Sequence, residues 1–195
     1  MALILASQSP RRRELLHQVG IDDFLILPAR GEEKKDPNLS PAELVEELSR
    51  QKAAEIAETH PNDTILAADT VVAYKGQVLG KPKDKENAAE MLRLLSGNTH
   101  QVYTGVTVRQ GEKICTCHEE TTVFFRPLTE EEIQWYISTG EPMDKAGSYG
   151  IQGLGAKFVR RIEGDYTNVV GLPLCLVGEL LNGFRQSDES AAKTN

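Results

Sequence analysis

This chain of 195 residues lacks any long hydrophobic run. None of its apolar stretches approaches the roughly 20 residues that a membrane-spanning helix needs. Its N-terminal region also lacks the basic, apolar and small-residue order of a secretory signal. We therefore expect a protein that does not bind to or enter a membrane, and we expect it in the cytoplasm.

The chain also has fewer basic than acidic residues. The chain carries 22 lysines and arginines against 29 aspartates and glutamates, which gives a net charge of −7 at neutral pH. Long-range attraction to a nucleic-acid polymer or to an anionic membrane is therefore not expected. A site for phosphate groups would have to be a local basic cluster in an acidic protein.

Cysteine and histidine are too few and too scattered to form a metal or disulfide framework. Cys115, Cys117 and Cys175 have no zinc-type spacing, and the four histidines lie far apart. Reduced thiols are the simpler interpretation. Two common nucleotide-binding motifs are missing as well, because the chain has neither a Walker loop nor the glycine fingerprint of a Rossmann fold.

The patterns that are present indicate an α/β protein. Apolar runs and turn residues predict strands at 2–6, 24–27, 64–68, 71–74, 77–79, 102–109, 113–125, 158–162 and 168–170. Capping residues and glycines predict helices at 9–20, 40–59, 85–96, 129–139 and 172–181.

This order of elements gives the fold class. Strands alternate with helices at first, whereas the middle of the chain is an antiparallel pair. We expect a mixed, twisted α/β sheet with flanking helices and two lobes around a cleft. One domain is expected over residues 1–184, followed by a polar, flexible tail over residues 185–195.

The densest basic cluster follows the first predicted strand. Ser9 is a natural helix N-cap and Pro10 suits the first helical position. Arg11, Arg12 and Arg13 then fall on the first turn. The free N–H groups of a helix start and the forked guanidinium donors suit a polyphosphate. The alternative is a solvated helix face, although cations at this end oppose the helix dipole.

Asp69 is the candidate acid–base residue. It follows the apolar run at 65–68, so it is expected at the end of a buried strand, where ligand sites of α/β sheets lie. A carboxylate there can hold a divalent cation or accept a proton from water. The alternative is a local turn formed with Thr70.

Three further charged residues are less specific by themselves. Lys81 lies in a loop that Pro82 fixes, where it could pair with a phosphate. Glu33 and Lys52 also match an ordinary solvated loop and an exposed helix position.

Residues 144–153 are the second segment dense in special residues. They read Asp-Lys-Ala-Gly-Ser-Tyr-Gly-Ile-Gln-Gly. Glycines allow a close approach of the backbone to a ligand, and Gln152 offers both a donor and an acceptor to the edge of a nucleobase. A structural turn with a surface glutamine is the alternative.

Together these motifs resemble the Maf family of nucleotide pyrophosphatases. The matching motifs are Leu5–Arg12, Ala68–Thr70, Gly80–Pro82, Leu95–Gly97, Asp144–Gly153 and Val169–Leu174, in order over residues 3–182. The resemblance implies a fold shared with inosine triphosphate pyrophosphatases (Maf/Ham1-like). It implies hydrolysis of a nucleoside triphosphate to monophosphate and pyrophosphate, with a divalent cation, Mg²⁺ or Mn²⁺, as cofactor.

The resemblance also assigns roles to single residues. It makes Asp69 the proton acceptor and places Glu33 among the polar residues of the cleft; Glu33 is chosen over Glu32 by its spacing to Lys52. We expect Glu33 and Asp69 to hold the divalent cation, and the sequence does not distinguish which of the two carboxylates is the base and which is only a metal ligand. The implied phosphate-binding residues are Ser7, Arg12, Lys52 and Lys81, and the implied specificity residues are Arg11, Thr70 and Gln152.

The specificity positions favour one subgroup of this family. Members that act on methylated guanine nucleotides typically carry Ser-Pro-Tyr-Arg, Ser-Asp-Gln and a glutamate where this chain has Arg11, Thr70 and Gln152. The chain looks like the dTTP/UTP group. An amide can match the alternating donors and acceptors of a pyrimidine, whereas a carboxylate offers acceptors only and suits guanine.

Two alternatives stay open from the sequence. The cleft could prefer a methylated guanine or another non-canonical nucleotide, or the protein could be a nucleotide-binding regulator of cell division with little catalysis. The favoured hypothesis is a house-cleaning hydrolase. A homodimer is a generic expectation, since two-fold assemblies are common.

Overall fold

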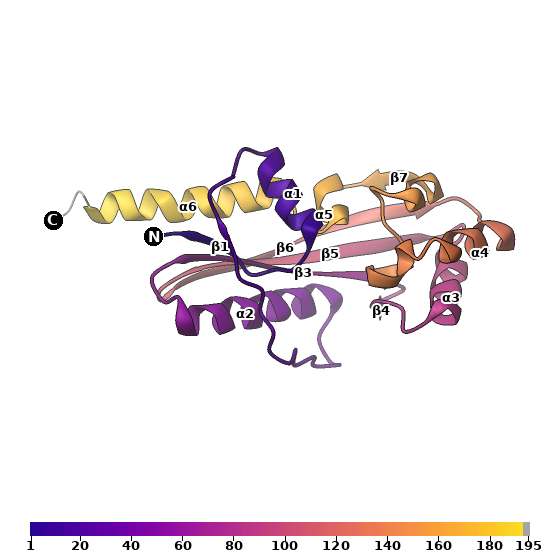
Figure 1. Cartoon of the computed structure of the whole chain (residues 1–195), viewed down its shortest axis with the longest axis horizontal. Coiled ribbons are helices and arrows are strands. Elements are labelled where there is room, and N and C mark those ends of the chain that lie inside the picture. The colour runs from indigo at the N-terminus through magenta and orange to yellow at the C-terminus, as the bar shows by residue number, and fades with distance from the viewer. Residues whose placement is uncertain (193–195) are drawn as a thin grey trace.

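The computed structural model describes the backbone of residues 1–192 and the side chains of residues 1–184. A seven-stranded mixed sheet runs along the molecule, with strand order β2-β1-β3-β5-β6-β7 and with β4 paired to β3 (Figure 1). Strand β1 is parallel to β2 and β3, and the other pairs are antiparallel. The strands are β1 (Leu3–Leu5), β2 (Leu25–Ile26), β3 (Thr64–Tyr74), β4 (Gln77–Leu79), β5 (Thr99–Gln110), β6 (Lys113–Phe125) and β7 (Val159–Glu163).

Helices flank both faces of this sheet, so the predicted mixed α/β class is confirmed. Helix α2 lies along one face, while α1 and α6 lie on the opposite side and α3 and α4 gather at one end (Figure 1). The α-helices are α1 (Pro10–Gln18), α2 (Pro41–Thr59), α3 (Lys85–Leu95), α4 (Glu130–Ser138), α5 (Tyr166–Val170) and α6 (Leu174–Ala192). Short 3₁₀ turns are η1 (Glu141–Asp144), η2 (Ala146–Ser148) and η3 (Leu154–Phe158). In the described part of the chain, no helix is both long and apolar enough to cross a bilayer.

The side chains of β3 alternate between two cores. Ala67 packs with Ala53 and Ile56 of α2. Its neighbour Ala68 faces the other way, into a cluster that includes Leu16 of α1 and Val177 of α6. Because side chains along a strand alternate in this way, Asp69 and Thr70 point to opposite faces of the sheet.

Strand β3 corrects one sequence prediction. The two strands expected at 64–68 and 71–74 form one continuous strand, so Asp69 lies in its middle and not at a strand end. The reason is that Thr70, Val71 and Val72 are β-branched and continue the pairing with β5, where Asp69 lies opposite Gly105.

Two predictions near the C-terminus were also wrong. Residues 168–170 are not a strand, because Asp165 caps a short helix by accepting a hydrogen bond from the Thr167 N–H (2.6 Å), and α5 results. The last helix begins at Leu174 and continues past Leu181 to Ala192. The flexibility expected for residues 185–195 stays a prediction, and residues 193–195 lie outside the described part.

The outer edge of β3 is uncovered in its middle. Strand β1 pairs with Thr64–Leu66, and β4 pairs with Val72–Tyr74. Neither strand reaches residues 67–71, although β5 pairs with them on the inner side. The sheet therefore has a gap at its edge, and Asp69 and Thr70 border that gap from opposite faces.

Helix α2 packs unusually close to the sheet at Gly105. A Cβ atom on this residue would lie 2.2 Å from the carbonyl oxygen of Val45 and 2.6 Å from the amide nitrogen of Glu46. Any side chain there would overlap the helix backbone. The absence of a side chain at Gly105 thus sets how near α2 comes to β3 and β5.

Candidate active site

A cleft of about 860 Å³ opens over the uncovered edge of β3. The elements that line it come from distant parts of the sequence: the start of α1, the loop before α2, α2 itself, β3, the loop after β4, the segment after η1 and the end of α5. Every residue to which the Maf resemblance gave a role lies on its wall, whereas Arg13, the third arginine of the basic cluster, does not. The residues on the wall are Ser7, Arg11, Arg12, Glu33, Lys52, Asp69, Thr70, Lys81 and Gln152.

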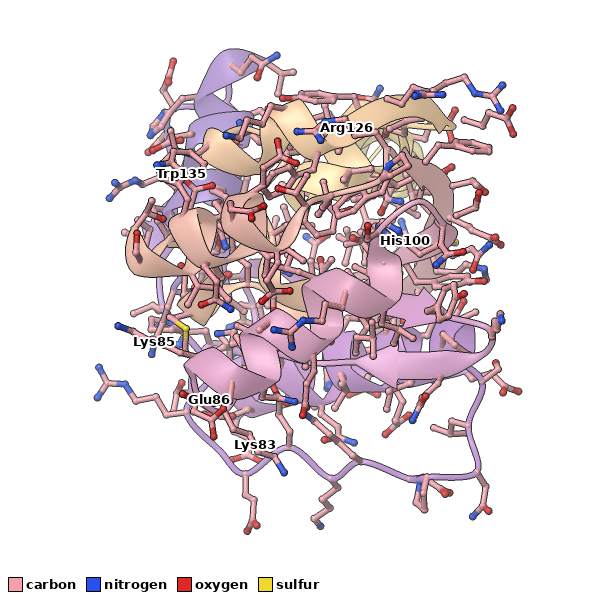
Figure 2. All side chains as sticks on the ribbon, turned by 90° about the vertical axis from the view of Figure 1, so that its right-hand side faces the viewer. Lys83, Lys85, Glu86, His100, Arg126 and Trp135 are labelled. Atoms are coloured by element: carbon pink, nitrogen blue, oxygen red, sulfur yellow. The ribbon has the colours of Figure 1, made fainter. Side chains whose placement is uncertain are left out.

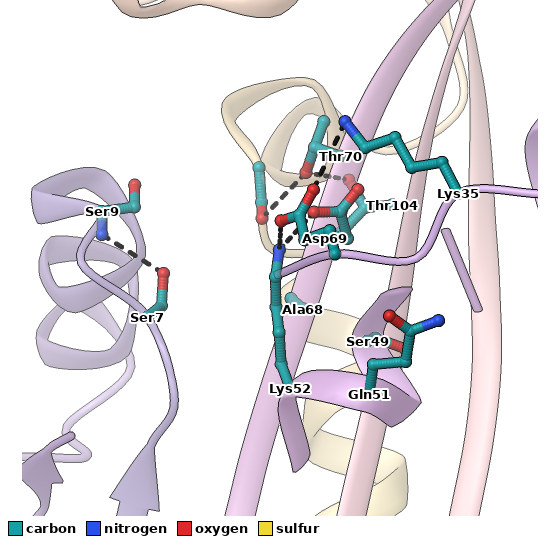
Figure 3. Close-up of polar contacts among 12 residues, drawn as sticks. Ser7, Ser9, Lys35, Ser49, Gln51, Lys52, Ala68, Asp69, Thr70 and Thr104 are labelled. Atoms are coloured by element: carbon teal, nitrogen blue, oxygen red, sulfur yellow. Dashed lines mark hydrogen bonds and ion pairs between the residues drawn. The ribbon is translucent and has the colours of Figure 1, made fainter. Parts of the chain in front are cut away.

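On the α2 side of β3, Lys52 lies between two carboxylates. Its ammonium pairs with Asp69 and, at 3.1 Å, with Oε1 of Glu33 (Figure 3). The Asp69 and Lys52 side chains are only 14% and 18% exposed, so this pair is poorly screened by solvent. Lys35 adds a second contact to Glu33, at 3.3 Å.

These two lysines control the ionisation of Glu33. Partial burial by itself raises the pKa of the Glu33 carboxyl, but the charges and hydrogen bonds of Lys52 and Lys35 outweigh burial and leave the pKa below its ordinary value. Glu33 is thus a carboxylate at neutral pH, available to a cation.

On the opposite side of β3, the Arg12 guanidinium makes four hydrogen bonds to neutral groups. Its Nε donates to the Gly171 carbonyl (2.8 Å), and Nη1 donates to the Ala68 carbonyl (2.8 Å) and to Ser7 Oγ (3.1 Å). Its Nη2 donates to Thr70 Oγ1 (3.0 Å). A guanidinium has five N–H donors, so one is left for a ligand.

Arg12 therefore connects three segments besides its own. It occupies the Ala68 carbonyl at the open edge of β3 and joins it to the end of α5. Burial lowers the pKa of this guanidinium, and Asp69 on the far side of the strand partly opposes that effect.

Thr70 and Ser7 belong to the same network. The Thr70 hydroxyl shares a hydrogen bond with Thr104 (2.9 Å, Figure 3). Ser7 Oγ accepts a hydrogen bond from the Ser9 N–H (3.2 Å). Ser9 occupies the predicted N-cap position of α1, but its side chain makes no capping hydrogen bond.

Lys81 differs from the other cations that line the cleft. Arg11, Lys35, Lys52 and Lys145 all have carboxylate partners, and Arg12 is held by neutral groups. Among the described residues, no hydrogen-bond or ion-pair partner occurs for Lys81. Its ammonium is free to bind an anion.

Sequence reasoning missed three charged residues of the cleft. Asp144 accepts from Lys145 Nζ (2.7 Å) and from Arg11 Nη1 (3.5 Å), which links η1 to α1 across the cleft. Lys35 is the third. Lys35 and Lys145 had the same signal as the residues that were nominated, namely a position within a charged or glycine-rich motif.

The fit of a divalent cation can be judged from the acidic residues. Among the side chains of residues 1–184, no group of three His, Cys, Asp or Glu residues could hold a metal by itself. Mg²⁺, however, commonly binds one or two carboxylates and completes its shell with water and substrate phosphate oxygens. Glu33 and Asp69, which both pair with Lys52, are two such carboxylates, so they fit a cation that takes its other ligands from water and substrate.

Comparison with known proteins agrees with this geometry. A family model described as "Maf-like protein" matches residues 2–184. The chain belongs to the Maf family. A Bacillus pumilus protein named dTTP/UTP pyrophosphatase is 54% identical to this Maf protein over 182 residues, which are 93% of this chain and 96% of that one. A Bacillus cytotoxicus protein of the same name is 52% identical over 189 residues, 97% of each chain.

The likeness of this Maf protein to solved structures is more distant. A Mycobacterium abscessus nucleoside-triphosphatase / dITP/XTP pyrophosphatase gives a TM-score of 0.47 at 15% identity and covers 82% of each chain. A likeness of this degree does not bear on the site or on its substrate.

Proposed function

We propose that this Maf protein hydrolyses nucleoside triphosphates, dTTP and UTP first among them, to the monophosphate and pyrophosphate. The observation that carries the proposal is the pairing of Asp69 with Lys52 in the same cleft as the unpartnered Lys81. The curated relatives named dTTP/UTP pyrophosphatase, at 54% and 52% identity over nearly the whole chain, support the same substrates.

The reaction needs one water and one base. Asp69 accepts a proton from a water molecule whose oxygen attacks the α-phosphorus. A new P–O bond forms there while the bond to the bridging oxygen breaks, and pyrophosphate leaves with that electron pair. Phosphoryl transfer depends mainly on positioning and on neutralising charge, which the basic wall of the cleft provides.

Several basic side chains of the cleft bind the triphosphate together. Lys81 binds phosphate oxygens as a point charge. The remaining N–H of Arg12, on the Nη2 that also donates to Thr70, adds one directed hydrogen bond, and Ser7 lies on the same wall of the cleft. Lys52 moves from its carboxylates toward the substrate as charge develops. Glu33 and Asp69 would hold Mg²⁺ or Mn²⁺, which when bound neutralises charge on the phosphate oxygens.

The nucleobase is recognised by Gln152, which also lines the cleft. Gln152 is exposed there and has no hydrogen-bond partner among the described residues, so its amide can offer a donor and an acceptor to a pyrimidine edge. Arg11 and Thr70 complete the proposed specificity set. The homodimer and the cytoplasmic location stay predictions from the sequence.

One release assay tests the proposal. Pyrophosphate is measured with Mg²⁺ or Mn²⁺ across the common and modified nucleoside triphosphates. We expect dTTP and UTP to give the highest kcat/KM. If kcat/KM is highest with a methylated guanine nucleotide, that nucleotide is the preferred substrate instead. If nucleotides bind but no pyrophosphate is released, the protein is a nucleotide-binding regulator and not a hydrolase.

A further inference from the structure

The segment Gly147–Tyr149 connects the loop that carries Lys81 with Gln152, and both of these residues line the cleft. The Gly147 N–H donates to the carbonyl of Gly80 (3.1 Å), directly before Lys81. Gln152 follows the segment by three residues. The spacing between the proposed phosphate-binding lysine and the proposed base-reading amide therefore depends on where this segment lies.

One residue of this segment, Ser148, has a backbone conformation that residues other than glycine rarely adopt. Gly147 has a φ of 66°, and Ser148 has a φ of 62°, in the left-handed region that serine rarely adopts. A Cβ on Gly147 would lie 2.9 Å from the Val72 side chain, so the segment also presses against β3. Such a conformation persists only when surrounding contacts enforce it.

A buried histidine supplies one of these contacts. His100 Nε2 and the Tyr149 hydroxyl share a hydrogen bond of 2.8 Å. The two rings meet edge to face with centroids 5.4 Å apart, and Phe125 packs against both, at 5.0 Å from His100 and 4.7 Å from Tyr149. Figure 2 shows His100 enclosed by other side chains, whereas Lys83, Lys85 and Trp135 lie near the periphery.

A histidine at position 100 is less stabilising than an apolar residue would be if it served only to fill the core. Its side chain is fully buried, and its Nδ1 has no partner among the described residues. A buried polar atom without a hydrogen bond lowers stability, so an aliphatic side chain would suit the core better. Burial also lowers the pKa of His100 to about 4, so the ring is neutral under ordinary conditions. What the ring contributes is the hydrogen bond to Tyr149.

We propose that His100 is a positioning residue for substrate recognition. Through Tyr149 it fixes the segment 147–149, and so it fixes Gln152 relative to Lys81 before substrate arrives. This inference rests on the proposed function, because it assumes that Lys81 binds phosphate and that Gln152 reads the base.

The physical consequence concerns binding more than chemistry. Without the hydrogen bond, the segment must be ordered by the substrate itself, which weakens binding. Loss of one buried hydrogen bond corresponds to a rise of about five- to tenfold in KM for dTTP. Inorganic tripolyphosphate has no base, so its affinity for the lysines of the cleft does not depend on Gln152.

The test removes the hydrogen bond from either end. We expect H100L and Y149F each to raise KM for dTTP about five- to tenfold, with kcat changed less than about twofold. The double variant should be no worse than either single variant, since both delete one bond. H100Q, which keeps a polar group near the Nε2 position, should recover most of the loss. The control H118L removes a surface histidine whose partner is Glu46, and it should leave KM unchanged.

Competitive inhibition by tripolyphosphate separates positioning from general damage. The inhibition constant should be unchanged in H100L and Y149F. An equal rise for tripolyphosphate and dTTP, or an unchanged KM for dTTP, would overturn the inference. If the wild-type protein binds a non-hydrolysable α,β-methylene analogue of dTTP but releases no pyrophosphate from dTTP itself, the proposed function fails. The dissociation constants of that analogue then decide the role of His100 in the same way.

Discussion

The two faces of β3 hold cations in different ways. On the α2 face, Lys52 pairs with the carboxylates of Asp69 and Glu33. On the other face, Arg12 donates only to neutral carbonyl and hydroxyl oxygens. The carboxylates keep free lone pairs for a cation or a proton, whereas most donors of Arg12 are already committed. The first face suits chemistry, and the second holds the cleft together.

The largest effect is expected from removing the proposed base on the first face. Asp69→Asn keeps an acceptor for Lys52 but cannot take a proton, so kcat should fall about 10³-fold. The melting temperature should stay within a few degrees. Steady-state pyrophosphate release and thermal unfolding measure the two effects, with the exposed Asp23→Asn as control. Activity above a tenth of wild type would exclude Asp69 as the base.

Arg12→Lys removes most of the hydrogen bonds on the second face of β3. An ammonium cannot reproduce four directed hydrogen bonds, so the carbonyls of Ala68 and Gly171 lose donors. We expect the free energy of unfolding in urea to fall by about 2–4 kcal/mol. Arg13→Lys, at the exposed next position, should change it by less than about 0.5 kcal/mol. Equal values for the two variants would mean that Arg12 does not hold the segments together.

Lys52→Met tests whether the first face is held by shared charge. The folded-state pKa of Glu33 is lowered, so its contribution to stability is present above the unfolded pKa and is lost as pH falls through the folded value. Without Lys52 that pKa rises toward its unfolded value, so less stability should be lost as pH falls, and the variant's stability should depend less on pH than the wild type's. The expected destabilisation at pH 7 is about 1–2 kcal/mol, because Glu33 is partly screened by solvent. Urea unfolding of both proteins between pH 4 and 7 provides the measurement, and parallel pH profiles would contradict the shared charge.

The smallest effect should come from Lys81, which belongs to neither network. Lys81→Ala should raise KM for dTTP about tenfold, the value of one hydrogen bond to a charged group. Its free energy of unfolding should change by less than about 0.5 kcal/mol, since no described partner is lost. Lys83→Ala, in the same loop but off the wall of the cleft, is the matched control. Similar KM values for both variants would leave Lys81 without a role in phosphate binding.

Local signals in the sequence predicted some elements closely. The serine–proline start of α2 forms the expected capping box with Glu43, and the helix ends at Thr59 as predicted. Strand β6 also matches its predicted bounds. Both depend on residues close together in the chain, which sequence patterns describe well.

Long-range contacts could not be predicted in the same way. One of the four hydrogen bonds of Arg12 goes to the carbonyl of Gly171, 159 residues away. The uncovered edge beside Asp69 depends on where β1 and β4 end. The sequence could nominate the residues of the cleft through the Maf motifs, but it could not show that two faces of one strand contribute to it.

Gly105 lies directly opposite Asp69 in the β3–β5 ladder, beneath the backbone of α2. Lys52 is carried by the same helix, two turns beyond Val45. A methyl group at position 105 would push α2 away from the sheet. The Lys52 ammonium would then move away from the Asp69 carboxylate. The absence of a side chain at Gly105 thus helps to set the distance between the Lys52 ammonium and the Asp69 carboxylate, although Gly105 does not itself line the cleft.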